Sequence, residues 1–150
     1  EREEYMSIIK ENHLAPYVIL HGRQAGQMLD LLFELCDFGI GSLGRHRSGI
    51  TNIKTLKNRE YAARGIPFIY SEIDEDFENM PYIMKIPANE EAVDIKQILN
   101  FYNQLHITPL EIRNSIRHLS WNNQMKKVLD KMQKKDKINP NNNNIANFAT

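Results

Sequence analysis

The 150-residue sequence has one cysteine, no excess charge of either sign and no long hydrophobic run. A single cysteine excludes an intramolecular disulfide and fits a reducing compartment. Because no stretch of about 18 apolar residues is present, we expect no membrane-spanning helix. Basic and acidic residues number 19 each, so bulk electrostatics predict no nucleic-acid partner. With 41% hydrophobic residues, the chain can still form the core of one globular domain.

Metal and nucleophile patterns are missing as well. The acidic cluster of residues 72–78 lacks the turn glycine of a calcium loop, and we expect it to be a solvated loop. Ser42 and Ser48 have no base nearby in sequence that would make either a nucleophile. We expect Cys36, next to an apolar stretch, to be a buried and inert thiol. No metal site is predicted, because five histidines lack ligand spacing: His13, His21, His46, His106 and His118.

Short apolar runs alternate with segments of helical periodicity. Strands are predicted at residues 17–20, 38–41, 67–71 and 82–86. Helices are predicted at residues 1–12, 25–36, 55–64, 91–105, from Thr108, and from Trp121, with Ser120 as its cap, to about Met132. This alternation predicts an α/β fold with a doubly wound, parallel, Rossmann-like sheet and helices on both faces.

The basic segment, residues 42–58, follows the second predicted strand and leads into a helix. It contains Arg45, Arg47, Lys54 and Lys57 and no acidic residue. A positive loop between a parallel strand and a helix N-terminus can hold a phosphate. The segment is neither a dinucleotide fingerprint nor a P-loop. It is therefore compatible with a solvated basic surface, and with a non-catalytic Rossmann-like module that binds a nucleotide or phosphate ligand.

The same region resembles a known family. The matching residues are Gly41-Ser42-Leu43-Gly44, His46-Arg47, the run from Leu56 to Ile69, and Leu119-Ser120-Trp121. They are similar to the C-terminal, donor-binding half of the group 1 (family 4-like) glycosyltransferases of the two-domain B fold. The resemblance covers residues 1–133, and residues 134–150 are expected to be a flexible polar tail. In that fold the last helix often crosses back onto the N-terminal domain.

The resemblance implies a role for two positions that are eight residues apart. The family carries a Glu-x7-Glu pair, and its second acid binds the nucleotide ribose. That position is Glu60 here, whereas the first acid is replaced by Asn52. An amide can hydrogen-bond a sugar but cannot act as a carboxylate. The alternative for Glu60 is a surface carboxylate paired with Arg64, four residues on.

Other positions suit the diphosphate and the base. Lys57 offers a point charge, and Arg45 and Arg47 offer planar forks for phosphate oxygens. His21 would edge the nucleobase, although a locally satisfied loop histidine is the alternative. The strand end and the helix start would supply backbone contacts through Gly41, Ser42, Thr55 and Leu56.

For the whole protein, the resemblance implies a hexosyltransferase of bacterial type that acts in polysaccharide biosynthesis. Its donor would be a nucleoside diphosphate sugar, with no separate cofactor. Its acceptor would be a glycan or a lipid-linked sugar held by a preceding acceptor domain. The 150-residue chain is therefore expected to be an inactive fragment by itself. The expected location is the cytoplasm, and peripheral association with the inner face of the membrane is compatible with this role.

Overall fold

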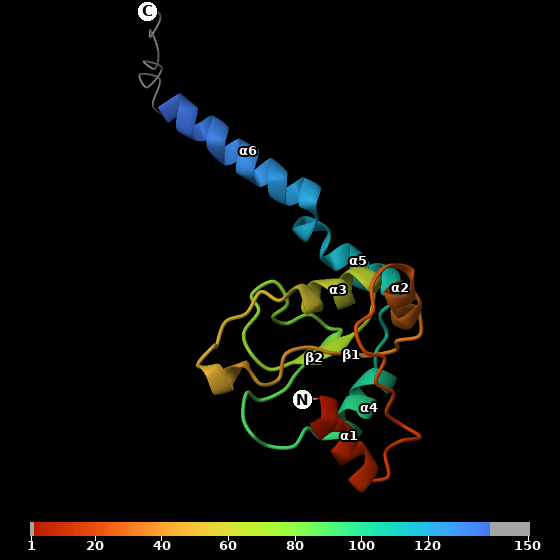
Figure 1. Cartoon of the computed structure of the whole chain (residues 1–150). Coiled ribbons are helices and arrows are strands. Elements are labelled where there is room, and N and C mark those ends of the chain that lie inside the picture. Colours follow the sequence, from red (N-terminus) through yellow and green to blue (C-terminus); the bar gives the residue numbers. More distant parts are fainter. Residues whose placement is uncertain (1, 139–150) are drawn as a thin grey trace, which may run out of the picture. The chain divides into compact units, whose positions relative to one another are not determined.

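The computed structural model describes residues 2–138, with side chains described to residue 133. The chain forms two compact units, Glu1–Cys36 and Asp37–Thr150. We describe each unit by itself (Figure 1).

The first unit contains helices α1 (Arg2–Glu11) and α2 (Gly26–Glu34), both predicted from sequence. The predicted strand at residues 17–20 is wrong. The backbone N–H groups of Tyr17 and Val18 donate to the Leu14 carbonyl over 2.9 and 3.0 Å, so this segment begins as a turn. None of residues 2–36 is buried. Cys36 is exposed, so the prediction of a buried thiol is also wrong.

The second unit contains a parallel sheet in the order β1-β2-β3. The strands are β1 (Gly39–Ile40), β2 (Phe68–Tyr70) and β3 (Ile83–Lys85), with Gly39 opposite Phe68 and Phe68 opposite Ile83. Helix α3 (Leu56–Arg64) connects β1 to β2 (Figure 1). The remaining elements are α4 (Ile95–Asn103), α5 (Pro109–Ser115), α6 (Trp121–Ile138) and the 3₁₀ turns η1 (Arg45–Ser48) and η2 (Arg117–Leu119).

The α/β class is thus confirmed at the level of a mixed fold with a small parallel sheet. The doubly wound, Rossmann-like topology with helices on both faces is not confirmed. A doubly wound sheet reverses its strand order at a switch point. In the described residues the strand order follows the chain, and turns rather than a helix connect β2 to β3.

Local capping signals explain where the helices begin and end. Thr55 is the N-cap of α3, and its hydroxyl accepts from the Asn58 N–H. Thr108 and Glu111 form the predicted capping box of α5. Gly65 ends α3 in the left-handed region, with a φ of 78°. The last helix extends to Ile138, past its predicted end and into the predicted tail, and residues 139–150 lie outside the described residues.

The core of the second unit is built around β2. All three residues of this strand are buried, and the Phe68 ring packs edge-on against Phe77 with centroids 5.5 Å apart. Ala62 of α3 and Ile112 of α5 cover the same cluster. Because β2 is tightly packed on these side chains, its carboxyl end is held in a fixed position. The positions of the polar residues that directly follow β2 are fixed as a result.

Candidate functional site

The candidate site lies where β1 and β2 end. The Gly41 N–H donates to the Ile69 carbonyl over 2.7 Å, and the Ser71 N–H donates to the Ser42 carbonyl over 3.0 Å. A Cβ atom on Gly41 would lie 2.8 Å from both Asn58 Oδ1 and the Ile69 carbonyl oxygen. Only glycine fits this position without a shift of its neighbours, so the strand end and the start of α3 are in close contact.

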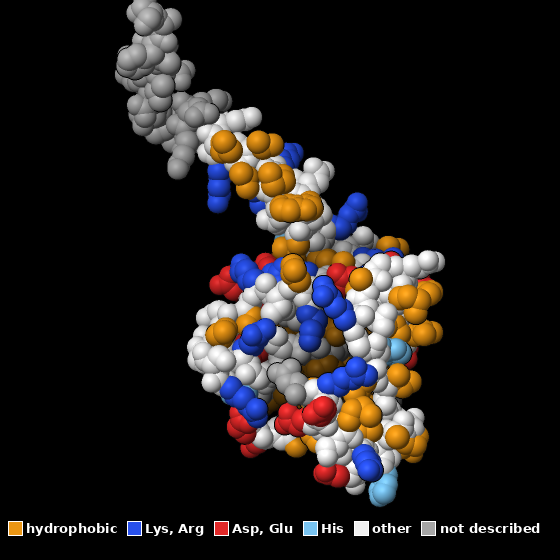
Figure 2. Space-filling model, viewed as in Figure 1, with side chains coloured by type: hydrophobic (Ala, Val, Ile, Leu, Met, Phe, Trp, Pro, Cys, Tyr) orange, Lys and Arg blue, Asp and Glu red, His pale blue; other side chains and the backbone are white. Residues whose placement is uncertain are grey.

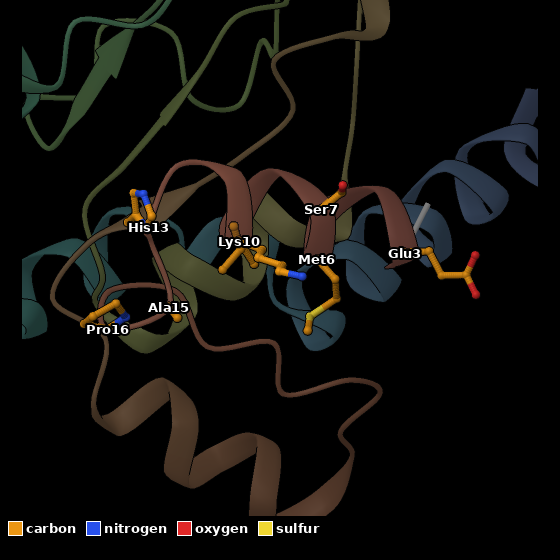
Figure 3. Close-up of a pocket in the computed structure, with 8 residues that line it drawn as sticks. Glu3, Met6, Ser7, Lys10, His13, Ala15 and Pro16 are labelled. Carbon is orange, nitrogen blue, oxygen red and sulfur yellow. The ribbon is translucent and has the colours of Figure 1, made fainter.

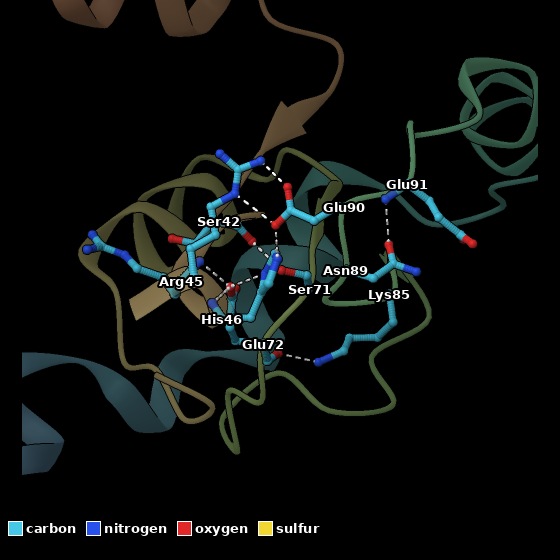
Figure 4. A network of polar contacts seen from close by, with 10 residues as sticks. Ser42, Arg45, His46, Ser71, Glu72, Lys85, Asn89, Glu90 and Glu91 are labelled. Carbon is cyan, nitrogen blue, oxygen red and sulfur yellow. Dashed lines mark hydrogen bonds and ion pairs between the residues drawn. The ribbon is translucent and has the colours of Figure 1, made fainter. Parts of the chain in front are cut away.

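Glu72 directly follows this strand end and interacts with the basic segment. Its Oε1 accepts the backbone N–H groups of Arg45 and His46 over 2.6 and 3.3 Å (Figure 4). The residue is only 2% exposed. Burial acts to raise the pKa of the Glu72 carboxyl, but hydrogen bonds from Ser71 and from the backbone outweigh burial and hold this pKa below its usual range. An internal carboxylate therefore occupies N–H groups that could otherwise bind an anion.

Glu90 engages two side chains of η1. Its Oε1 lies 2.9 Å from both Arg47 Nε and His46 Nε2, and its Oε2 accepts from the Arg47 guanidinium (Figure 4). The Arg47 hydrogen bond and then the His46 hydrogen bond lower the pKa of Glu90 to about 2. Glu90 thus stays ionised at neutral pH and competes with any anion that Arg47 would bind.

The acidic segment after β2 is not the solvated loop that the sequence predicted. Asp74 is fully buried, and its Oδ2 accepts from Asn58 Nδ2 over 3.1 Å and from Arg59 over 3.2 Å. Arg59 also pairs with Asp76. The prediction is wrong because helix α3 supplies an amide and a guanidinium that the sequence pattern did not place beside this segment.

Glu78 is a second anchor in the same segment. Its Oε1 accepts from the Tyr70 hydroxyl over 2.9 Å, from the Asp74 N–H over 3.1 Å and from Lys85 Nζ over 2.9 Å. Although burial acts to raise the pKa of Glu78, the hydrogen bonds from Lys85 and Tyr70 keep it below its usual range. Lys85 also donates to the Glu72 carbonyl (Figure 4). The segment after β2 is therefore held to the sheet by charged groups.

The outer face of α3 carries the predicted ribose ligand. Arg64 Nε lies 2.5 Å from Glu60 Oε1, which is the surface pair that formed the alternative interpretation. The Glu60 side chain remains 44% exposed. Lys57 lies three residues before Glu60 and therefore on the same side of the helix. The N–H groups of Leu56 and Lys57, in the first turn, have no acceptor among the described residues.

Asn52 lies beside the segment after β2. It forms a parallel bridge with Ile73, and the neighbouring Ile53 N–H donates to the Ile73 carbonyl over 2.8 Å. A small cavity of about 170 Å³ lies at this bridge and is also lined by Lys54 and Glu75, whose charged groups are 3.7 Å apart. The Asn52 amide donates to the Thr51 hydroxyl. Asn52 is exposed and within reach of a polar ligand.

Three buried polar atoms in this region have no hydrogen-bond partner among the described residues: His46 Nδ1, Asn58 Oδ1 and Glu72 Oε2. The first lies 4.0 Å from Glu72 Oε1. A buried polar atom without a hydrogen bond costs free energy, so these three atoms lower the stability of this region.

Most of the predicted site residues therefore fall in one β–α–β unit. The loop after β1 and the start of α3 carry nine of them: Gly41, Ser42, Arg45, Arg47, Asn52, Thr55, Leu56, Lys57 and Glu60. His21 belongs to the first unit, where it is exposed and its carbonyl accepts from Gln24 over 2.6 Å.

No family model, curated protein or solved structure matched the chain. Among residues 2–138, no group of three or more His, Cys, Asp or Glu side chains could hold a metal ion.

Sequence reasoning missed the carboxylates that engage the basic segment, namely Glu72, Asp74, Glu75 and Glu90. One signal could have identified the first. Glu72 follows the buried run 66–71 without an intervening turn residue, so its backbone must lie at the strand end, beside a segment that has no acid of its own. Glu90 has no comparable signal, because it is 43 residues from Arg47.

A larger hollow lies in the first unit and has a different character (Figure 3). Its volume is about 760 Å³, and α1 and the turn after it form its walls. Apolar groups of Met6, Ile9, Ala15 and Pro16 supply most of the lining, and Lys10 and His13 also line it. It contains none of the predicted site residues.

Proposed function

We propose that the chain is the donor-binding half of a glycosyltransferase that moves a sugar from a nucleoside diphosphate sugar to a polysaccharide or lipid-linked acceptor. One observation carries this proposal. The β1–α3–β2 unit presents Lys57, Glu60 and two unpaired helix N–H groups on α3, whose first turn lies beside Gly41 at the carboxyl end of a parallel strand. Ligands of parallel α/β sheets bind at that end.

The half-exposed Glu60 carboxylate suits a ribose diol, because a carboxylate can accept two hydroxyl hydrogen bonds at once. Its pairing with Arg64 leaves room for this role, because Arg64 Nε contacts Oε1 and Oε2 is the second oxygen of the carboxylate. Lys57 and the N–H groups of the first turn of α3 suit the diphosphate. Arg45 is exposed on η1 and can add charge to the same ligand.

Arg47 can contribute only after it separates from Glu90. Both side chains are exposed, at 69% and 62%, so water screens their attraction and the contact is easily exchanged for a phosphate. A diphosphate carries more negative charge than one carboxylate. We therefore expect the donor to displace Glu90 from Arg47 rather than to find Arg47 unoccupied.

The chemistry of such a site is electrostatic. Negative charge develops on the departing diphosphate as the bond to the sugar breaks, and cationic groups held in place beforehand stabilise that charge. Lys57, Arg45 and Arg47 would perform this role. We assign no catalytic acid or base to the described residues.

A second candidate is a non-catalytic module that binds a nucleotide or another phosphate ligand. Asn52 favours it, because this position lacks the carboxylate that would contact the transferred sugar. The two candidates differ in whether the sugar of a nucleotide sugar changes the binding affinity. A transferase half should bind a nucleotide sugar and its nucleoside diphosphate with different affinities, whereas a plain nucleotide module should bind both equally.

The ribose assignment predicts the behaviour of Glu60→Ala. We expect it to weaken nucleoside diphosphate binding by about 1.5–3 kcal/mol, the scale of a hydrogen bond to a charged group. Calorimetry on the purified chain measures this. The matched control is Arg64→Ala, which breaks the same ion pair but keeps the carboxylate, and should leave the affinity nearly unchanged. Equal affinity for wild type and Glu60→Ala would refute the assignment.

The diphosphate assignment predicts a pattern rather than one value. Lys57→Ala and Arg47→Ala should weaken diphosphate binding more than nucleoside binding. The difference should shrink at high salt, because the screening length falls from about 10 Å at 0.1 M to about 3 Å at 1 M. Glu90→Gln should act in the opposite direction, because it releases Arg47. Lys96→Ala, on α4, is the control. An equal loss of affinity for the diphosphate and for the nucleoside would exclude a phosphate site here.

A further inference from the structure

Helix α6 has an apolar face that nothing in the described chain covers. Its large apolar side chains are between 46% and 81% exposed: Trp121, Met125, Val128, Leu129 and Met132. Their spacing of three and four residues places them on one side of the helix. Figure 2 shows the apolar side chains gathered along α6, with Lys and Arg side chains beside them.

The charge of this helix differs from that of the chain. Residues 121–138 contain six lysines and two aspartates, although the whole chain is neutral. By helical spacing, Lys126, Lys127 and Lys131 lie off the apolar stripe. An apolar stripe, a lysine-rich polar face and a tryptophan at one end are typical of helices that lie in the interface of a bilayer.

A second observation lies just before the helix. A cavity of about 340 Å³ is lined by Arg59, Arg113 and Arg117, with apolar Ile116 and Leu119. Arg59 is neutralised by Asp74 and Asp76, but Arg113 and Arg117 have no carboxylate partner in the described part of the chain. Two unneutralised guanidinium groups beside an apolar lining suit an anionic head group attached to an apolar chain.

A second copy of the chain is a less suitable occupant. The apolar spacing resembles a coiled-coil seam, but 18 residues give fewer than the three heptads that such a seam needs. The lysines of two copies would also repel one another. An anionic surface, in contrast, attracts all of them at once.

We propose that α6, together with Arg113 and Arg117, is a docking surface for an anionic lipid bilayer. The helix would lie along the bilayer surface, with its apolar stripe in the boundary region and its lysines among the head groups. It would not cross the bilayer, since no helix in residues 2–138 is both long and apolar enough to do so. This inference is independent of the donor site.

Vesicle binding tests the proposal directly. Trp121 is the only tryptophan and is 81% exposed, so its fluorescence reports insertion without a label. We expect a blue shift when the 150-residue protein meets vesicles of phosphatidylcholine and phosphatidylglycerol. Vesicles of phosphatidylcholine alone should bind much more weakly, and high salt should reverse most of the binding.

Matched substitutions on exposed positions separate the contributions. Leu129→Gln should weaken binding to anionic vesicles about tenfold, because it removes a side chain that would leave water. Lys131→Gln should weaken it about fivefold. Leu99→Gln and Lys96→Gln make the same changes on α4 and should have no effect. Circular dichroism checks that every variant is folded.

Three outcomes would overturn the proposal. The first is no binding to anionic vesicles by the folded wild type. The second is a lack of selectivity. Either the protein binds neutral and anionic vesicles equally, or the α4 and α6 substitutions change vesicle binding equally. The third is self-association that Leu129→Gln abolishes, measured by sedimentation in the absence of vesicle binding, which would assign the stripe to a second copy.

Discussion

Glu72 and nearby carboxylates occupy groups of the basic segment that could otherwise bind an anion. By its residue types, the basic segment is open to a phosphate, yet Glu72 already satisfies the N–H groups of Arg45 and His46. Glu90 likewise pairs with Arg47. At the residue scale, the two cationic groups of the basic segment that have no carboxylate partner among the described residues are therefore Arg45 and Lys57.

Glu72→Gln should destabilise the fold by about 1.5–3 kcal/mol at neutral pH, because an amide accepts hydrogen bonds less strongly than a buried carboxylate. Urea unfolding measures this. Glu75→Gln, in the same segment but with a 76% exposed side chain, should change stability little. Equal effects of the two substitutions would mean that the Glu72 contacts contribute nothing to stability.

The same residue predicts a pH dependence. The pKa of Glu72 is lower in the folded state than the ordinary value of 4.5. Its contribution to stability is therefore complete above about pH 4.5 and is lost as the pH falls through the folded value. Wild-type stability should decline more steeply below pH 4.5 than that of Glu72→Gln. Parallel declines would contradict this assignment.

At the element scale, close backbone contacts fix how α3 and α5 meet. Gly65 ends α3 with a φ of 78°, and a Cβ atom there would lie 2.6 Å from the Pro109 carbonyl oxygen at the start of α5. Thr108 caps α5 immediately before that proline. The end of one helix is thus fitted to the beginning of another, and both cover the aromatic cluster around Phe68.

Two glycines with similar backbone angles test this fit. Gly65→Ala should cost about 2–4 kcal/mol, the sum of left-handed strain and overpacking. Gly49→Ala carries the same strain, with a φ of 69°, but a Cβ atom there meets nothing within 4 Å. It should cost only about 1 kcal/mol. The difference in the free energies of unfolding measures the contact with Pro109, and no difference would refute that contact.

At the scale of the whole molecule, burial is concentrated in one unit. Every buried residue in the described chain lies at or after Gly39, and α1 and α2 have none. A helix of 10 residues is only marginally stable without packing. The two units should therefore differ in local stability.

Hydrogen exchange should reveal that difference. The N–H groups of Gly41 and Ser71, which bond across the ends of β1 and β2, should exchange on the order of a hundredfold or more slowly than those of α1. Mass spectrometry of peptides from the two units compares them in one experiment. Similar protection in α1 and β2 would show that the first unit is stabilised as strongly as the core.

Sequence reasoning succeeded where the signal is local. Thr55, Thr108 and Gly65 each fix a helix end through their own side chain or backbone, so both ends of α3 and the start of α5 were predicted close to where they are observed. It failed where the partner is distant. The carboxylates of Asp74 and Glu78 were predicted to be solvated, because nothing in residues 72–78 shows that Asn58, Arg59 and Lys85 lie beside them.

The sequence predicted the roles of the candidate-site residues less completely than it predicted the helix ends. The sequence placed Lys57 and Glu60 in or beside a helix that follows a strand, which the structure has. It could not show that Arg47 is already paired, because Glu90 is 43 residues away. The prediction of the sheet topology was limited for the same reason, because strand order depends on pairing between segments that are distant in the sequence.

The exposed Cys36 has a practical consequence. It is the only thiol in the chain and the last residue of the first unit, whereas Trp121, the only indole, belongs to the second. A thiol-reactive acceptor dye can therefore be attached at one known position of the natural sequence. Energy transfer from Trp121 to that dye then measures the separation of the two units in solution, and its change on adding a nucleotide or vesicles measures their movement.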